Sequence, residues 1–541
     1  MRLKKENDKN KLLGVYYTPV KLAEYLVYNF IPQSSVNSIL EPSCGEGVFV
    51  RSLMKTCLKN KNITAVEIDN KKIESLKEKI CFDNIKFLHS DFFDFYKNCK
   101  ENYDLVIGNP PYIRYQYLNK LQRNAQSKIL KSNGMKPNNL INAWVAFTVA
   151  CTSLLSNNGT LVFVIPAELL QVAYANDLRK FLVDNFQSLD IIAFDEIIFP
   201  EIEQETVVLI GKKQSEKKGI RFFKTANVNT LHTIEIESVN YEPMPEPDLK
   251  WTTLLAEENA SQLIEQIKNN VNFRSFSELA VINVGVTTGN NDFFSINKET
   301  NLKYDLKSKC IPLIGRSCYF SGTFVTKKDI QKNYDEGKKS HLLVIEDKEL
   351  NEFDEKIIEY IKFGERNKVN KGYKCKIRKH WYSVPSIWIP DAFFARRNGE
   401  YPKVLMNTCK AVSTDTLHRI KFKEGVDKIE AVLSYYNSIS FAFTEICGRS
   451  YGGGVLEILP TEALNIYLPI VKNLNDDEKK KILKNIDKKI RNGTPIEKVL
   501  DYTDKIILID GLGLNHDYVM KFRKIWKTLQ QRRLLRGKKR L

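Results

Sequence analysis

The sequence predicts an α/β protein with two domains, the first a doubly wound, mostly parallel seven-stranded sheet and the second an α+β domain. Up to about residue 215, short apolar runs alternate with amphipathic segments, which is typical of a parallel sheet covered by helices. The chain has 541 residues, of which 43% are hydrophobic. It can therefore bury more than one core, because single domains rarely grow beyond about 300 residues.

The expected elements of the first domain alternate along the chain. Seven strands are predicted at 38–40, 63–68, 85–89, 103–108, 160–165, 189–194 and 206–210. Helices are predicted between them at 19–30, 47–58, 71–80, 141–155 and 169–184. This alternation fits one doubly wound domain.

A proline-punctuated acidic stretch, Glu242-Pro243-Met244-Pro245-Glu246-Pro247-Asp248, interrupts this rhythm and predicts a linker. We therefore expect a catalytic domain at 1–240, a linker at 241–250 and a second domain at 251–515. The second domain is rich in aromatic residues and in turn signals. The last segment, 516–541, is expected to be a basic tail that is either solvated or in contact with phosphates.

Composition excludes several classes of protein. No run approaches the roughly 18 apolar residues of a membrane span, and the N-terminus is polar, unlike a signal peptide. The ten cysteines include no C-x-x-C pair, so neither a metal site nor a disulfide framework is indicated. The net charge of +18 comes mostly from the part after residue 240, which carries +13. A cytoplasmic protein that binds nucleic acid and no metal is expected.

A glycine-containing turn follows the first predicted strand, in the run Glu41-Pro42-Ser43-Cys44-Gly45-Glu46-Gly47. Paired glycines at the start of a helix let the backbone approach a ligand closely. The second strand ends in Glu67-Ile68-Asp69, where a nucleoside-binding sheet places a carboxylate on the ribose hydroxyls. The pattern predicts a nucleoside cofactor with Glu67 on its ribose.

The acidic residue before the glycine pair favours one cofactor. A nicotinamide or flavin dinucleotide needs a third glycine and room for a pyrophosphate, which Glu41 would repel. S-adenosylmethionine (SAM), a sulfonium with a charged amino group, suits an acidic site. After the third strand, Asp91 and Phe92 are suited to a purine amino group and ring, although such an aspartate is often only a helix cap. The strand ends that carry Glu41, Glu67, Asp91 and Asn109 predict a crevice at one sheet edge.

The fourth strand leads into Asn109-Pro110-Pro111-Tyr112, the most specific feature of the chain. An exocyclic amino group on a base is a poor nucleophile, so an enzyme must accept hydrogen bonds from it while aiming the nitrogen at a methyl sulfonium. The Asn109 side-chain oxygen and the Pro110 carbonyl are suitable acceptors, and two prolines make the loop rigid. Tyr112 offers a stacking face for an unstacked base. This chemistry needs neither a nucleophilic side chain nor a metal.

Two basic segments are predicted to contact nucleic acid. From 112 to 140 there are six lysines and arginines and no acid, interleaved with aromatic residues, among them Arg114, Tyr115 and Tyr117. The alternative is a solvated flexible loop. A second cluster contains Arg366, Lys368, Lys371, Lys374, Lys376, Arg378 and Lys379.

The first 215 or so positions resemble the gamma-ordered, TaqI-like and Eco57I-like adenine-N6 methyltransferases of restriction-modification systems. The resemblance is carried by the runs described above together with Tyr17-Thr18-Pro19, Asn139-Leu140 with Trp144, Leu161 to Pro166, and Phe199-Pro200. It implies that Tyr17, Thr18 and Pro19 bind SAM and that Phe199 stacks with Tyr112 on a flipped adenine. It also implies a bacterial or archaeal cytoplasmic enzyme.

The same resemblance extends to the second domain, where Gly285 to Asn290 and Gly448-Arg449-Ser450-Tyr451-Gly452-Gly453-Gly454 are similar to segments of Eco57I-like target-recognition domains. It implies that this domain binds double-stranded DNA, with Arg449 and Tyr451 among the contacts. The length leaves little room for a fused endonuclease, so we expect a separate cognate nuclease or none.

Three alternatives stay open. The Asn-Pro-Pro-Tyr chemistry also suits an rRNA adenine or a protein glutamine, although the large second domain argues against both. A cytosine-N4 methyltransferase would more commonly have serine at position 109. A catalytically inactive DNA-binding protein would need a broken crevice, whereas every expected polar group is present.

Overall fold

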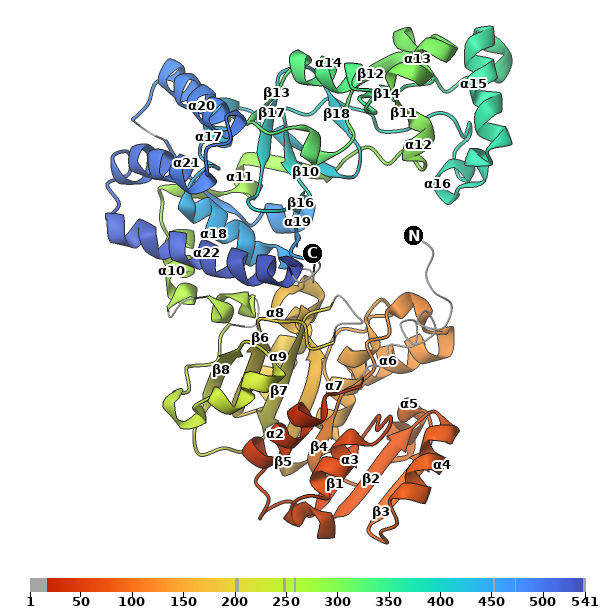
Figure 1. The fold of residues 1–541 in the computed structure, drawn as a ribbon, viewed down its shortest axis with the longest axis vertical. Helices are drawn as coiled ribbons and strands as arrows, with labels where there is room; N and C mark the ends of the chain where they lie inside the picture. Colours follow the sequence, from red (N-terminus) through yellow and green to blue (C-terminus); the bar gives the residue numbers. More distant parts are fainter. Residues whose placement is uncertain are drawn as a thin grey trace. The chain divides into compact units, whose positions relative to one another are not determined.

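The computed structural model describes residues 17–199, 204–246, 250–256, 259–450, 453–471 and 473–538 (Figure 1). They belong to two compact units. Unit 1 is Met1–Ala256 with Tyr451–Gly454 and Leu535–Leu541, and unit 2 is Glu257–Ser450 with Val455–Leu534. The first unit therefore continues beyond the linker predicted at 241–250. Its last turn, η6 (Trp251–Leu255), buries Trp251 completely, and Thr252 Oγ1 donates to Leu170 O at 3.2 Å.

Unit 1 is built on an eight-stranded sheet of order β3-β2-β1-β4-β5-β7-β6-β8. Its strands are β1 (Ser38–Glu41), β2 (Asn62–Glu67), β3 (Ile85–His89), β4 (Tyr103–Gly108), β5 (Leu155–Pro166), β6 (Ser188–Phe194), β7 (Thr206–Lys212) and β8 (Gly219–Thr225). Only β7 is antiparallel to its neighbours, β5 and β6. The mostly parallel sheet is confirmed.

One strand, β8, is absent from the sequence prediction, which gave seven. Its apolar run is interrupted by Arg221, which opposes Asp190 on the parallel neighbour β6. The Arg221 guanidinium donates to both Asp190 carboxylate oxygens, at 2.8 and 2.9 Å, in a buried ion pair. A strand that buries a paired charge has no continuous apolar signature, so hydropathy alone misses it.

The helices of unit 1 flank this sheet. They are α2 (Val20–Phe30), α3 (Val48–Leu53), α4 (Asn70–Lys79), α5 (Phe92–Asn98), α6 (Lys120–Ser132), α7 (Ala143–Ser153), α8 (Glu168–Gln171) and α9 (Asn176–Asn185). α2 packs on α3, and α7 packs on α6 and α9. The helix predicted at 169–184 is divided into α8 and α9. Helices α5 and α6 were not predicted, because α5 is short and α6 buries only Gln126, Ile129 and Leu130.

Unit 2 combines small sheets with many helices, and the predicted α+β class is confirmed. Its strands are β9 (Phe273–Ser275), β10 (Ala280–Val284), β11 (Ser295–Ile296), β12 (Cys310–Ile314), β13 (Phe324–Val325), β14 (His341–Leu343), β15 (Ala392–Ala395), β16 (Arg397–Asn398), β17 (Val404–Asn407), β18 (Val412–Ser413), β19 (Leu417–Phe422), β20 (Arg449–Ser450), β21 (Leu456–Glu457) and β22 (Tyr467–Pro469). The largest sheet has the order β10-β19-β15-β17-β13.

Most helices of unit 2 are short, and the last of them continues from Leu535 into unit 1. They are α10 (Ala260–Lys268), α11 (Phe276–Leu279), α12 (Asn291–Phe294), α13 (Lys298–Tyr304), α14 (Lys327–Asp335), α15 (Glu355–Arg366), α16 (Tyr373–Lys376), α17 (Lys428–Leu433), α18 (Ser438–Cys447), α19 (Pro460–Ala463), α20 (Asp476–Arg491), α21 (Ile496–Thr503) and α22 (His516–Lys538).

Helix α22 replaces most of the basic tail expected at 516–541. Its Arg523 and Arg533 are buried and pair with the carboxylates of Asp504 at 2.8 Å and Glu445 at 2.7 Å. Burial raises the pKa of Glu445, and the Arg533 charge opposes that shift. These two arginines therefore stabilise the fold and are not available for phosphates. The basic charge of the sequence could not show this, because burial depends on residues far away in the chain.

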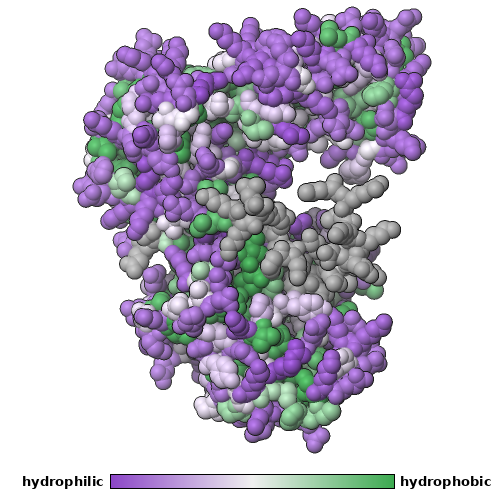
Figure 2. Space-filling model, in the orientation of Figure 1, coloured by the Kyte–Doolittle hydropathy of each residue, from purple (hydrophilic) through white to green (hydrophobic). Residues whose placement is uncertain are grey.

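Hydrophilic side chains cover most of the visible face of the described residues (Figure 2). No helix in the described part of the chain is long and apolar enough to cross a membrane.

Replacing Arg533 with methionine should lower the free energy of unfolding by about 3 kcal/mol or more, because it leaves the Glu445 carboxylate buried without its cation. The double variant Arg533→Met with Glu445→Leu should recover most of this loss. Urea denaturation measures both, with exposed Lys521→Met as the control expected within about 0.5 kcal/mol of wild type. A harmless Arg533→Met would contradict a structural role for this pair.

Candidate active site

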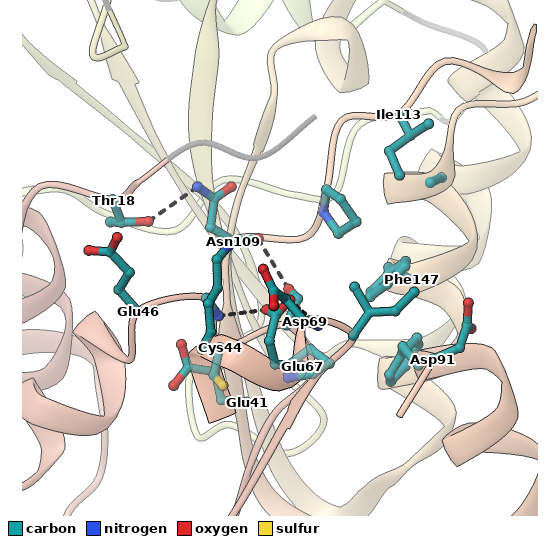
Figure 3. Close-up of a pocket in the computed structure, with 18 of the residues that line it drawn as sticks. Thr18, Glu41, Cys44, Glu46, Glu67, Asp69, Asp91, Asn109, Ile113 and Phe147 are labelled. Atoms are coloured by element: carbon teal, nitrogen blue, oxygen red, sulfur yellow. Dashed lines mark hydrogen bonds between the residues drawn. The ribbon is translucent and has the colours of Figure 1, made fainter. Parts of the chain in front are cut away.

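The crevice predicted at the sheet edge is present as a cavity of about 550 Å³ (Figure 3). Because β1 to β4 are mutually parallel, their carboxyl ends meet at one edge, and residues that follow all four strands line the cavity. Their polar side chains include five acids, Glu41, Glu46, Glu67, Asp69 and Asp91, and the amide of Asn109.

Glu67 at the end of β2 joins two loops. Its Oε2 accepts from the Gly45 amide at 2.9 Å, and its Oε1 accepts from the Asp69 amide at 3.1 Å. The turn also needs glycine, since Gly45 and Gly47 have φ of 53° and 75°. A Cβ on Gly47 would lie 2.7 Å from Leu76 Cδ2. The glycines and the carboxylate together fix the backbone that faces the cavity.

Glu41 ends β1 and is 1% exposed. Its Oε2 accepts from the Val50 amide, in the first turn of α3, at 3.2 Å. Burial raises the pKa of Glu41 well above the usual carboxyl range, while the Val50 hydrogen bond and the Arg51 charge oppose the shift. Burial also raises the pKa of the adjoining Cys44 thiol, so Cys44 is an inert lining residue.

The residues that follow β3 both cap helix α5 and line the cavity. Asp91 Oδ1 accepts from the Phe93 amide at 2.8 Å and so caps α5. Phe92 stacks on Phe147 of α7 with ring centroids 4.3 Å apart. All four residues, Asp91, Phe92, Phe93 and Phe147, line the cavity, and the three phenylalanines give it an apolar wall.

The loop after β4 begins at the cavity. Asn109 Nδ2 donates to Thr18 Oγ1 at 3.2 Å, and Ser43 Oγ donates to the Asn109 carbonyl at 3.2 Å. Asn109 is thereby tied to the segment before α2 and to the β1–α3 turn. The Tyr112 hydroxyl donates to Val164 O in β5 at 3.1 Å. The loop is held at both ends by groups from other elements.

The structure gathers most, but not all, of the predicted site residues around the cavity. Those that line it are Tyr17, Thr18, Glu41, Pro42, Ser43, Cys44, Gly45, Glu67, Ile68, Asp91, Phe92, Asn109, Pro111 and Tyr117. The described lining does not include Pro19, Gly47, Pro110, Tyr112 or Phe199. Tyr112 and Phe199 are both buried.

Several lining residues were not predicted from the sequence, because they come from helices and not from strand ends. They include Phe49, Arg51, Lys72, Gln122, Ala143 and Phe147. Lys72 Nζ lies 5.6 Å from the centroid of the Tyr17 ring. A helix face gives no sequence signal for the cavity that it borders, so only the packing of α3, α4, α6 and α7 reveals these residues.

The predicted nucleic-acid residues of unit 1 lie in and beside η2 (Tyr115–Tyr117). Arg114 and Tyr117 are exposed and Tyr115 is partly buried. Tyr117 borders the cavity, so this segment forms part of its rim.

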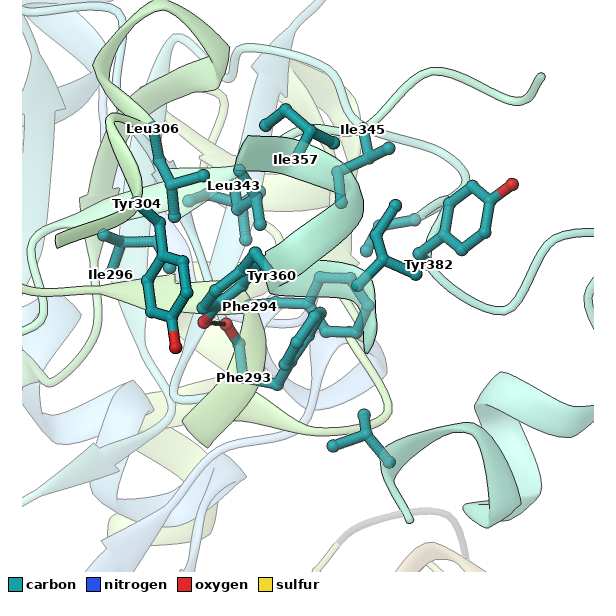
Figure 4. Close-up of a cluster of buried hydrophobic side chains, with 14 of the residues drawn as sticks. Phe293, Phe294, Ile296, Tyr304, Leu306, Leu343, Ile345, Ile357, Tyr360 and Tyr382 are labelled. Carbon is teal, nitrogen blue, oxygen red and sulfur yellow. Dashed lines mark hydrogen bonds between the residues drawn. The ribbon is translucent and has the colours of Figure 1, made fainter. Parts of the chain in front are cut away.

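In unit 2 the predicted basic cluster surrounds α16 beside an aromatic core (Figure 4). Arg366, Lys368, Lys374 and Lys376 are exposed. Arg378 has a different position: its Nη2 donates to the carbonyls of Thr287 at 3.1 Å and Thr288 at 2.8 Å. Arg449 Nε donates to Glu462 at 2.7 Å. Tyr451 lies outside the described residues.

Two family models match most of the chain. The model described as "Eco57I restriction-modification methylase" matches residues 27–199, and "Type II methyltransferase M.Eco57I, C-terminal domain" matches residues 248–508. Type II methyltransferase M.AccI from Acinetobacter calcoaceticus is 24% identical over 92% of this chain and 94% of its own. M.HincII from Haemophilus influenzae is 30% identical over 43% of this chain and 41% of its own.

Among solved structures, a cryoEM structure of a DrdV–DNA complex is similar with a TM-score of 0.51 at 12% identity, covering 90% of this chain and 58% of that one. This likeness concerns the fold. The mixed sheet, the acid-lined crevice and the matched models make this chain a methyltransferase with a Rossmann-like catalytic unit. More particularly, it belongs to the Eco57I-like restriction-modification methylases.

Replacing Glu41 with glutamine should make the free energy of unfolding fall less as the pH rises from about 4 to about 8. The raised pKa means that the folded state holds this proton more tightly than the unfolded chain does. The stability that the protonated Glu41 carboxyl contributes to the wild type is therefore fully present below the ordinary carboxyl pKa. It is lost as the pH rises from there toward the pKa of the folded state. Glutamine carries no charge and keeps an oxygen for Val50.

The measurement is the free energy of unfolding in urea at about pH 4 and about pH 8. We expect the difference between Glu41→Gln and wild type to shift in favour of the variant at the higher pH. The same difference at both pH values would show that Glu41 ionises in the fold without penalty.

Proposed function

We propose that this methylase transfers a methyl group from SAM to the exocyclic N6 of an adenine that has left a DNA duplex at a specific site. The observation that carries this proposal is the Asn109-Pro110-Pro111-Tyr112 loop, which begins at the acidic crevice. The acceptors of this loop suit an amino group on a planar ring, and the crevice beside them suits a cationic nucleoside.

The donor set of the crevice fits SAM. The Glu67 carboxylate suits two ribose hydroxyls, and Glu41 suits the amino group of the methionine end. Ile68 and Phe92, with Asp91 at the same wall, suit an adenine ring and its amino group. When bound, SAM supplies a methyl group that is already activated by the sulfonium charge.

The residues of the loop would then act by position. Asn109 Nδ2 donates a hydrogen bond to Thr18 Oγ1. This bond orients the amide so that its Oδ1 faces the other way, as an acceptor. With the Pro110 carbonyl, this oxygen would accept the two amino hydrogens of adenine and direct the nitrogen lone pair at the methyl group. No side chain of the protein forms a covalent bond in this scheme.

Aromatic faces would hold the unstacked base. Tyr112 and Phe199 are the candidates, and both are buried. A base therefore reaches their rings only when the segments that carry them shift, which the DNA would induce on binding.

Unit 2 is proposed to recognise the DNA sequence. The model that matches it is the C-terminal domain of a Type II methyltransferase, and the similar DrdV structure is a DNA complex. The proposed DNA contacts are Arg114, Tyr115 and Tyr117 in unit 1 and Arg366, Lys368, Lys374 and Lys376 in unit 2. Arg378 and Arg449 would instead hold the protein segments that they bridge. A separate cognate endonuclease is the proposed partner in the cell.

The direct test incubates the purified protein with tritiated SAM and unmethylated genomic DNA, rRNA or protein extract, followed by digestion to nucleosides. N6-methyladenine from DNA is the expected product. N4-methylcytosine, or label found only in RNA or protein, would overturn the proposed substrate.

Asn109→Ala should abolish transfer, by about a thousandfold or more in kcat, because it removes an acceptor that acts on the amino group in the transition state. SAM affinity should stay within a few-fold of wild type. Single-turnover methylation and SAM titration calorimetry measure the two effects. Near-normal turnover would contradict the assigned mechanism.

Glu67→Ala should weaken SAM binding by at least about tenfold, since it removes both a ribose acceptor and the acceptor of the Gly45 amide. Glu74→Ala, on the neighbouring helix α4, is the matched control and should bind SAM as the wild type does. An unchanged affinity for Glu67→Ala would exclude Glu67 from the ribose site.

A further inference from the structure

An exposed leucine stands beside the mouth of the crevice. Leu121, in the first turn of α6, is 81% exposed. The adjoining residues Tyr117, Leu118 and Gln122 line the same cavity as Asn109. Leu121 is therefore an apolar side chain presented to solvent by a segment that borders the site of reaction.

The start of α6 is capped and its later turns are packed. Asn119 Oδ1 accepts from the Gln122 amide at 2.9 Å, and Gln122 Oε1 accepts from the Asn119 amide at 3.2 Å, which forms a capping box at the start of α6. Further along the helix, Ile129 and Leu130 are buried against the rest of unit 1. Leu121 consequently projects from the capped end of a helix that is packed into unit 1.

The exposed face of α6 is cationic. Leu121, Asn124, Lys128 and Lys131 recur at a spacing of three or four residues, so they share one face of the helix, and all four are exposed. The segment 112–140 contains no acid. A face with lysines behind an apolar tip has the charge and shape to follow a phosphate backbone while the tip meets the base stack.

We propose that Leu121 is a wedge that enters the DNA duplex at the gap left by the departing adenine. An apolar side chain in that gap replaces the lost stacking of the neighbouring bases and keeps the adenine from returning. Tyr117, four residues before this tip in the chain, lines the cavity. The proposal rests on the proposed function, because it requires a duplex substrate with an unstacked target base.

The experiment compares Leu121→Ala, Leu121→Met and Leu302→Ala with wild type. Leu302 in α13 of unit 2 is 72% exposed and serves as the matched control for loss of a surface leucine. The substrate is a duplex that carries the site found by sequencing DNA methylated by the wild type. In a second duplex, 2-aminopurine replaces the target adenine and reports its unstacking by increased fluorescence.

Leu121→Ala should lower kcat/KM on the normal duplex by about tenfold and reduce the fluorescence increase, with SAM affinity unchanged. Leu121→Met and Leu302→Ala should behave as wild type. When the target adenine is mispaired, less work is needed to extrude it, so the defect of Leu121→Ala should shrink to about threefold or less.

Equal fluorescence and turnover for Leu121→Ala and wild type would overturn the wedge, as would a defect of the same size on normal and mispaired duplexes. Failure of the wild type to produce N6-methyladenine in DNA would overturn the proposed function instead. The two failures are thus distinguishable.

Discussion

The crevice of unit 1 depends on the Glu67 carboxylate, which accepts one backbone amide from each of two loops. Because β1 and β2 are adjacent and parallel, the loops that leave them start side by side, and one acid at the end of β2 can join them. The positive φ values of Gly45 and Gly47 then let the turn close without strain. The bridge thereby fixes the β1–α3 turn, whose Ser43 and Cys44 line the cavity.

The site combines a buried acid with a rigid acceptor loop. Glu41 lies almost completely inside, where its pKa is raised, and a cationic ligand would favour its ionised form. Asn109 is held by Thr18 from one side and by Ser43 from another. Catalysis by positioning needs such anchoring, because an acceptor that moves freely gains little in the transition state.

Basic residues serve two different purposes in this chain. Arg221, Arg523 and Arg533 are buried against carboxylates and stabilise the fold. Lysines of α6 and around α16 are exposed and form the surfaces proposed for DNA. The count of 83 lysines and arginines therefore overstates the number of cationic side chains available to phosphates.

Sequence patterns were sufficient to predict which site residues lie together when those residues end or directly follow a strand. Glu41, Glu67, Asp91 and Asn109 could be placed together because parallel strands end at one edge, whatever the rest of the fold does. Phe147 and Lys72 could not be placed at the cavity in this way. They reach it from helices, and packing decides which face of a helix turns toward the cavity.

The sequence by itself determined the doubly wound class, seven strands of the sheet and the residues at its carboxyl edge, because these depend on local periodicity and short motifs. Only the tertiary structure decided that β8 pairs with β6, with Arg221 opposite Asp190, and that the basic C-terminal segment is a packed helix. It alone also decided that Tyr112 and Phe199 are buried and that Leu121 is exposed beside the crevice. Burial and ion pairing join residues far apart in the chain, and no local pattern specifies which of them meet.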